Sequence, residues 1–220
     1  MIPVRASFQI GIYLLAAMSL VPPCVAEEPR VIRLASPDAS VGAPPDTCQP
    51  ALTGLGGPVT WQVLLVHNRA ALAETSRVAV DNRYPICILD SVKASDVELG
   101  VSFAPISGKI DQAAGLIFRV KDANNYYVAR ANALENNVNL YHVTNGIRRQ
   151  IAGVNVAVPT GQMQELGIRI EGNTIKASLD GRLLFEAVDR TIDGAGAVGL
   201  WTKADSVTAF YELTITVIRE

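Results

Sequence analysis

The stretch GLIFRVKDANNYYVARAN, residues 115–132, decides the fold class of this chain. In its first half, Leu116, Phe118 and Val120 alternate with Ile117 and Arg119. This period of two predicts a β-strand that turns one face toward a hydrophobic core. The polar run 121–125 predicts a turn, because Asp and Asn side chains hydrogen-bond the backbone close to them. A second, aromatic-rich strand follows over 126–132, and we expect the two strands to pair.

The same alternation extends along the chain on both sides of this stretch. It recurs over 97–103, 138–143, 166–170, 175–179 and 208–218. Asn145-Gly146 lies between two such segments and is a strong hairpin signal, because both residues tolerate a positive φ. Turn signals recur about every 8–12 residues, which is typical of an antiparallel β-sandwich. We therefore predict one all-β antiparallel sandwich over residues 51–220, with a helical turn at the alanine-containing segment Arg69–Glu74 as the only helical signal.

The N-terminal residues 1–26 have the pattern of a secretory signal peptide. Arg5 precedes an apolar run over 10–21, and Cys24-Val25-Ala26 offers small residues to a signal peptidase. The run is shorter than the about 20 residues that a membrane span needs. We predict a periplasmic or secreted protein with no membrane span in its mature part; a retained anchor and a lipoprotein signal at Cys24 are the alternatives. Residues 27–50 carry five prolines and little periodicity, which predicts an irregular lead-in.

Removal of the signal peptide would leave two cysteines, Cys48 and Cys87. In an exported protein this count favours one disulfide, with two buried free thiols as the alternative. The formal charge of −2, from 19 basic and 21 acidic residues, offers no basic surface for nucleic acid.

Several segments together resemble the LamG-like, concanavalin A-like superfamily. They are Gly115–Arg119, Asn125–Asn132, Asn145-Gly146, Gly172-Asn173, Leu179–Gly181, Gly196–Thr202 and Phe210–Leu213. The nearest group by resemblance is the 3-keto-disaccharide hydrolase domain, and the resemblance covers roughly residues 55–218. It implies a jelly roll of two curved antiparallel sheets, whose concave face commonly holds carbohydrate. Where members of that group often have two aspartates after a C-terminal phenylalanine, this chain has Tyr211 and Glu212, which weakens any transfer of a metal or catalytic role.

The sequence shows no pattern of catalytic carboxylates for glycoside cleavage. The Glu-x-Asp-x-x-Glu motif of retaining glucanases on this fold is absent, and the nearest pair, Asp96 and Glu98, is expected to be a solvated strand end. His67 and His142 lack a metal-ligand spacing, so no metal site is predicted. The oxygens of 122–125 are possible calcium ligands, but a plain polar turn is the favoured interpretation, and we predict no cofactor.

One sheet face carries the residue types that suit a polyhydroxyl ligand. Arg119 is expected to point away from the core, and pairing through the turn would put it on one surface with Arg130 and Asn132. Asn139 and Tyr141 would extend that surface on the next strand. Planar donors reach hydroxyl groups and an aromatic ring covers the apolar face of a sugar. Trp201 is expected either to line this surface or to fill the core, the core being favoured.

From these patterns we predict an exported, non-catalytic carbohydrate-binding or structural domain. The alternatives are a glycoside-cleaving enzyme that acts on 3-keto sugars or related glycosides, and a protein-interaction domain. The sequence leaves the ligand and the oligomeric state open.

Overall fold

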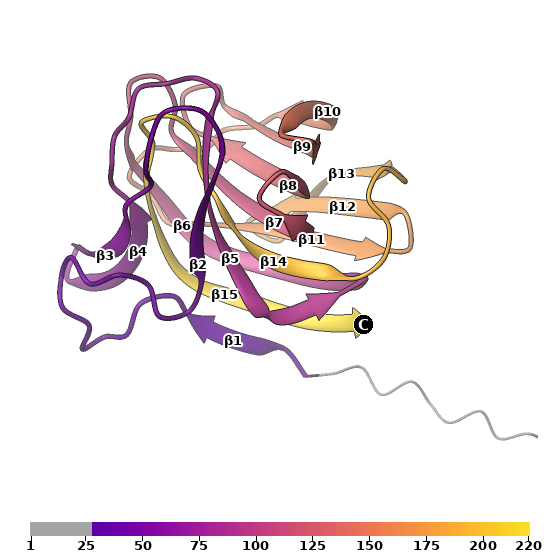
Figure 1. Cartoon of the computed structure of the whole chain (residues 1–220), viewed down its shortest axis with the longest axis horizontal. Coiled ribbons are helices and arrows are strands. Elements are labelled where there is room, and N and C mark those ends of the chain that lie inside the picture. Colours follow the sequence, from indigo (N-terminus) through magenta and orange to yellow (C-terminus); the bar gives the residue numbers. More distant parts are fainter. Residues whose placement is uncertain (1–27) are drawn as a thin grey trace, which may run out of the picture.

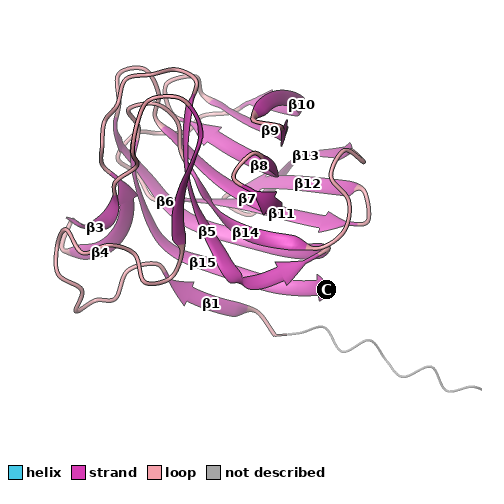
Figure 2. Ribbon diagram, viewed as in Figure 1, coloured by secondary structure: helices cyan, strands magenta, loops and turns pink. Residues whose placement is uncertain are grey.

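The computed structural model describes residues 28–220, so the predicted signal peptide lies outside the described residues. In this part the chain forms fifteen strands in two stacked sheets (Figure 1). Strands and loops account for all of it (Figure 2). No helix of the described residues is long and apolar enough to cross a membrane.

The first sheet has eight strands and contains the last strand of the chain near its middle. In spatial order its strands are β13 (Arg182–Val188), β12 (Thr174–Leu179), β11 (Gln164–Glu171), β6 (Asp96–Ser107), β15 (Val207–Arg219), β4 (Arg69–Glu74) and β3 (Trp61–Val66), and β1 (Arg30–Arg33) pairs with β15. Figure 1 shows β1 running beside β15 at the lower edge of the molecule.

The second sheet has seven strands and contains the segment that decided the fold. In spatial order its strands are β10 (Ile147–Asn155), β9 (Asn137–Thr144), β8 (Asn125–Asn132), β7 (Ala113–Asp122), β14 (Gly196–Trp201), β5 (Arg83–Ala94) and β2 (Gln49–Gly54). The pairings in both sheets are antiparallel, so the predicted all-β sandwich is confirmed.

The main hydrophobic core lies between the two sheets. Leu116 and Phe118 of β7 meet Leu166 and Ile168 of β11 there, and all four are buried as predicted. Trp61 also belongs to this core and packs beside Phe210, with ring centroids 5.9 Å apart. A second cluster lies on the opposite face of the seven-stranded sheet.

Cys48 and Cys87 form the predicted disulfide, with their Cα atoms 5.3 Å apart. The bond ties the residue before β2 to the middle of β5, next to the pairing of Pro50 with Cys87. The lead-in expected over 27–50 is less irregular than predicted, because it contains β1 and the first two residues of β2.

The helical turn expected at Arg69–Glu74 is wrong, because this segment is strand β4. Its residues pair with β3 from Arg69 opposite Val66 to Glu74 opposite Trp61, and Leu72 lies opposite Phe210 of β15. Alanine favours a helix only weakly, so burial between two strands outweighs that preference.

Strand β7 breaks its alternation at Arg119, which has a φ of +47°. The register with β8 shifts between Phe118 and Asp122, as in a β-bulge. Val120 consequently lies in the outer cluster of the seven-stranded sheet and not in the main core, contrary to the sequence prediction. The bulge also redirects the Arg119 side chain, with consequences for the predicted site.

Candidate functional site: the concave face of the seven-stranded sheet

The seven-stranded sheet is strongly curved, and its outer face is concave. The guanidinium of Arg148 on β10 lies 4.8 Å from the ring centroid of Tyr84 on β5. These strands are five positions apart in the sheet, about 24 Å if it were flat. Because the two side chains together are too short for that span, the sheet must bend so that its two edges approach each other. Thr53 of β2 likewise reaches the Tyr126 hydroxyl of β8, at 2.9 Å.

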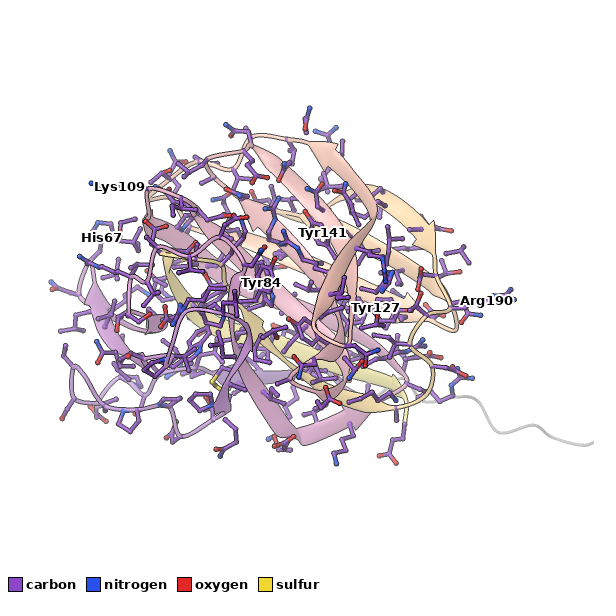
Figure 3. The ribbon with its side chains drawn as sticks, turned by 45° about the horizontal axis from the view of Figure 1, so that its top comes forward. His67, Tyr84, Lys109, Tyr127, Tyr141 and Arg190 are labelled. Carbon is purple, nitrogen blue, oxygen red and sulfur yellow. A yellow bond between two sulfur atoms is a disulfide. The ribbon has the colours of Figure 1, made fainter. Side chains whose placement is uncertain are left out.

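Aromatic side chains fill one part of this concave face. We call Tyr84, Tyr126, Tyr141 and Trp201 the aromatic floor. Tyr84 stacks on Trp201 with centroids 5.4 Å apart, and the Trp201 indole donates to the Tyr126 hydroxyl at 3.3 Å. Burial raises the pKa of Tyr126 to about 12. Arg148 lies across this floor, 4.5 Å from the ring centroid of Tyr141 (Figure 3, where Tyr84 and Tyr141 are labelled).

Polar side chains gather beside the aromatic floor, and Arg130 lies at their centre. We call this group the concave polar cluster; its members are Asp111, Arg130, Asn132, Glu135, Asn137, Asn139 and Lys203. Arg130 Nη2 donates to Glu135 Oε2 at 2.9 Å and to Asn137 Oδ1 at 2.6 Å. With its amide oxygen turned toward this donor, Asn139 accepts from Arg130 Nη2 at 3.1 Å and from the Tyr141 hydroxyl at 3.0 Å.

Arg130 and Glu135 form an ion pair in this cluster. Arg130 is only 1% exposed, whereas 46% of the Glu135 side chain reaches solvent. Partial burial acts to raise the pKa of Glu135, but the hydrogen bond and charge of Arg130 outweigh it and hold the pKa below its ordinary value. Arg130 Nε is buried and has no hydrogen-bond acceptor among the described residues. The cluster therefore presents a partly exposed carboxylate that a buried guanidinium holds in place.

Asp111 and Lys203 extend the cluster from two loops. Lys203 Nζ lies 2.8 Å from Asp111 Oδ2, and Asn132 Nδ2 donates to Asp111 Oδ1 at 2.6 Å. Burial raises the pKa of Asp111 above its ordinary value, and the hydrogen bond and charge of Lys203 oppose this only in part. Lys203 also pairs with the exposed Asp81, and these two carboxylates raise its pKa despite its burial.

Asp205 holds the loop that carries Asp111. Its carboxylate accepts hydrogen bonds from three successive backbone N–H groups, those of Lys109, Ile110 and Asp111, at 2.7–3.1 Å. Partial burial acts to raise the pKa of Asp205, but these bonds outweigh it and lower the pKa. Asp205 is therefore a positioning residue for the concave polar cluster.

Replacement of Asp205 by asparagine is expected to lower the free energy of unfolding at pH 7 by about 1.5–3 kcal/mol, the usual worth of hydrogen bonds to a charged group. The folded-state pKa of Asp205 is lowered, so its charge contributes fully to the free energy of unfolding above the unfolded-state pKa of about 3.9. This contribution is lost as the pH falls through the folded-state pKa. Denaturant titrations from pH 7 to pH 3 measure this, with the exposed Asp90→Asn as the control. A deficit in Asp205→Asn that stays constant over this range would contradict the role of the charge.

The structure brings four of the six predicted site residues together. Arg130, Asn132, Asn139 and Tyr141 lie side by side on β8 and β9, with Arg130 opposite Asn139. Trp201 lies on the same face of the sheet, in the aromatic floor beside these residues, but its side chain is fully buried. It does not belong to the core between the sheets.

The expectation that Arg119 shares this surface is wrong. Because of the bulge in β7, its side chain points to the end of the sandwich, where it donates to the backbone oxygens of Ser95 between β5 and β6, of Ile192 between β13 and β14, and of Gly172 in the turn between β11 and β12. It also pairs with Asp96 at 3.3 Å and is 2% exposed. Asp96 is accordingly buried, not solvated as predicted, while Glu98 is exposed and pairs with Arg169.

Sequence reasoning missed Asp111, Lys203, Glu135, Asn137 and Arg148. A signal for Arg148 was present: the two-residue turn at Asn145-Gly146 sets Ile147 opposite Thr144 and Arg148 opposite Val143, on the face of Tyr141. Asp111 and Lys203 lie in loops far apart in sequence, and no periodicity places loop residues.

The polar turn expected at 122–125 is present, since Asp122 Oδ1 accepts from the backbone N–H of Asn124 and from the Asn125 side chain. Within residues 28–220, no three His, Cys, Asp or Glu side chains are grouped as metal ligands.

Two antiparallel sheets, one with a concave outer face, define a concanavalin A-like, galectin-like β-sandwich. Among solved structures, the chain is similar to the carbohydrate-binding module CBM66 from Bacillus subtilis, with a TM-score of 0.61 and 23% identity over 78% of this chain and 97% of that one. It is also similar to a protein of unknown function with a galectin-like fold from Bacillus subtilis (TM-score 0.54, 12% identity, 76% and 88% covered). A third is a β-1,3-1,4-glucanase derived from a mouse hindgut metagenome (TM-score 0.55, 11% identity, 86% and 98% covered). At these identities the likeness establishes the fold alone.

Among curated proteins, the levanase of Bacillus subtilis (strain 168) is 29% identical over 129 residues. The match covers 58% of this chain but only 19% of the levanase. No protein-family model matches the chain, so its resemblance to the 3-keto-disaccharide hydrolase domain remains a prediction.

Proposed function

We propose that this chain is a non-catalytic carbohydrate-binding domain of an exported protein, and that its concave polar cluster contacts the sugar. The observation that carries the proposal is the fixed arrangement of Arg130, Glu135 and Asn139 beside the Tyr141 ring. The partly exposed Glu135 carboxylate accepts hydrogen bonds from sugar hydroxyls, and the Asn139 amide and the Tyr141 hydroxyl can donate to them or accept from them. The buried Arg130 guanidinium holds Glu135 and Asn139 in place. Such a prearranged set of partners loses little conformational entropy on binding.

The small exposed fractions of the side chains in the concave polar cluster are consistent with a shallow binding site for sugar. Tyr141 is 7% exposed, Asn139 8% and Lys203 7%, and the more exposed Glu135 lies at the rim. A ligand would touch the edges of these side chains from above, while Asn132 and Asp111 support them from beneath.

A glycoside-cleaving activity, including one on 3-keto sugars, is the weaker alternative. The two nearby carboxylates, Asp111 and Glu135, have pKa values shifted in opposite directions, as an acid and a nucleophile would. However, Asp111 is fully buried and bound to Asn132 and Lys203, so it has no access to a glycosidic oxygen.

The comparisons and the disulfide support this proposal. The partial match to a levanase makes levan the first polysaccharide to test, and a structure of the same fold carries the name of a carbohydrate-binding module. The Cys48–Cys87 disulfide is typical of an oxidising compartment, which supports export to the periplasm or beyond the cell.

The mature protein is expected to bind a subset of a glycan array that includes levan and β-glucan oligosaccharides. In the double variant Glu135→Gln/Tyr141→Phe the affinity for the best ligand should fall about tenfold or more, because two hydrogen-bonding groups worth roughly 1 kcal/mol each are altered. These changes keep the Arg130 contact and the Tyr141 ring. Isothermal titration calorimetry measures the affinity.

The matched control is Arg190→Ala, an exposed residue at the far edge of the molecule (Figure 3), which should leave the affinity unchanged. Unaltered affinity in the double variant would remove the concave polar cluster from the proposal. An array on which no glycan binds would favour a protein-interaction domain.

A further inference from the structure

The outer face of the eight-stranded sheet, on the other side of the molecule from the concave polar cluster, contains a hollow. Its volume is about 740 Å³, within the range of roughly 300–1,000 Å³ usual for small-ligand sites. Its lining comes mainly from β6, β11, β12 and β15, with Glu28 and Pro29 at one end. This hollow plays no part in the site described above.

The floor of the hollow is a row of small residues that crosses four strands. Gly167 of β11 lies opposite Gly100 of β6, Ser178 of β12 flanks Gly167, and Thr214 of β15 flanks Gly100. Glycine in the interior of a strand costs about 0.5–1 kcal/mol. Neither glycine has a positive φ, so the backbone conformation does not require glycine at either position. A glycine of this kind often marks a place where a ligand approaches the backbone closely.

The walls of the hollow are polar and carry charges of both signs. Glu98 and Glu165 supply carboxylates, and Arg169 and Lys176 supply cations. Arg169 pairs with both Glu98 and Glu171, which holds its guanidinium at the wall. Ser178, Thr214 and Thr216 add hydroxyl groups. An apolar partner would bury these charges at a high cost, and a strongly charged ligand would meet like charges as well as opposite ones.

We propose that this hollow is a second ligand site, which takes a neutral polyhydroxyl ligand, a short oligosaccharide. One sugar ring would lie flat on the Gly100–Gly167 backbone, and its hydroxyl groups would bond to the carboxylates and donors of the walls. The domain would then hold two sugars on opposite faces. This site is independent of the concave polar cluster.

The glycine floor provides a variant that blocks the hollow without harming the fold. A Cβ added at Gly100 would meet only the Glu165 side chain, at an ordinary distance of 3.5 Å, so Gly100→Thr projects its side chain into the hollow. Threonine also favours strands over glycine, so the melting temperature should stay equal or rise. Gly167 is less suitable, because its Cβ would collide with Ser178 Oγ. Ser102→Thr, on the same face of β6 but outside the hollow, is the matched control.

The test follows backbone amide resonances of the ¹⁵N-labelled mature protein during titration with a fructotriose and with a glucotriose. In the wild type and in Ser102→Thr, at least one sugar is expected to shift the Gly100 and Gly167 amide resonances until the site is saturated. In Gly100→Thr, the Gly167 amide resonance should not shift. The Trp201 indole resonance reports the concave face separately, so failure at one face is distinguishable from failure at the other. The proposal is overturned if neither glycine shifts, or if the Gly167 shift persists in Gly100→Thr. It is also overturned if the shifts depend on protein concentration in the absence of sugar, because that result would indicate a second copy of the chain on this face.

Discussion

Replacement of Arg119 by alanine is expected to lower the free energy of unfolding by about 3–5 kcal/mol, the usual cost of removing one partner of a buried ion pair. The guanidinium makes four contacts, one with Asp96 at the start of β6 and three with backbone oxygens in the connections β5–β6, β11–β12 and β13–β14. Alanine would leave Asp96 without this buried partner, although Arg219 still contacts its other oxygen at 2.8 Å. Chemical denaturation followed by tryptophan fluorescence measures the effect.

The matched controls are Arg190→Ala, which should change the stability by less than about 0.5 kcal/mol, and Arg119→Lys, which should fall between the two. Sugar affinity of any folded Arg119→Ala protein should equal that of the wild type, because Arg119 does not lie on the concave face. A stability loss below about 1 kcal/mol, together with lost sugar binding, would contradict the structural role and restore Arg119 as a binding residue.

Removal of the disulfide in Cys48→Ala/Cys87→Ala is expected to lower the free energy of unfolding by roughly 3–4 kcal/mol. The bond closes a loop across a sequence separation of 39 residues, and its loss frees that loop in the unfolded chain. Both positions are buried, so alanine avoids burying a new polar group. Denaturation curves of the wild type with and without reductant, beside the variant, measure the effect.

The reduced wild type should match the double variant within about 1 kcal/mol, since both lack the cross-link. An unchanged stability in the variant would mean that the lead-in before β2 contributes little to the cooperative unit.

Much of the fold follows from local rules that act within one strand or one turn. The alternation in 115–132 places Leu116 and Phe118 in the core, because side chains on a strand point to opposite faces. Asn145-Gly146 sets the register of β9 and β10, since both residues adopt a positive φ there. Such features are predictable because neighbouring residues determine them.

Features that depend on distant residues were not predictable in this way. The bulge at Arg119 reverses the alternation of β7 and brings the side chain to acceptors on Asp96 and Gly172, which are distant in sequence. Strand β4 forms because β3 and β15 flank it, although its own residues favour a helix. Both errors arise where tertiary contacts outweigh local preference.

The candidate site contains residues of both kinds, some placed by local rules and others by contacts between distant segments. Arg130, Asn132, Asn139 and Tyr141 share a face because of strand parity, and the sequence predicts their proximity correctly. Asp111 and Lys203 complete the cluster from loops that Asp205 and neighbouring backbone groups hold in place. No sequence spacing connects these loop residues, so only the folded chain reveals that they meet.

A crystal structure of the mature domain with its best array ligand tests the central claim most directly. The account predicts a sugar on the concave face of the seven-stranded sheet, with hydroxyl groups within hydrogen-bond distance of Glu135 and of Asn139 or the Tyr141 hydroxyl. A sugar that is well ordered elsewhere while the concave face holds none would contradict it.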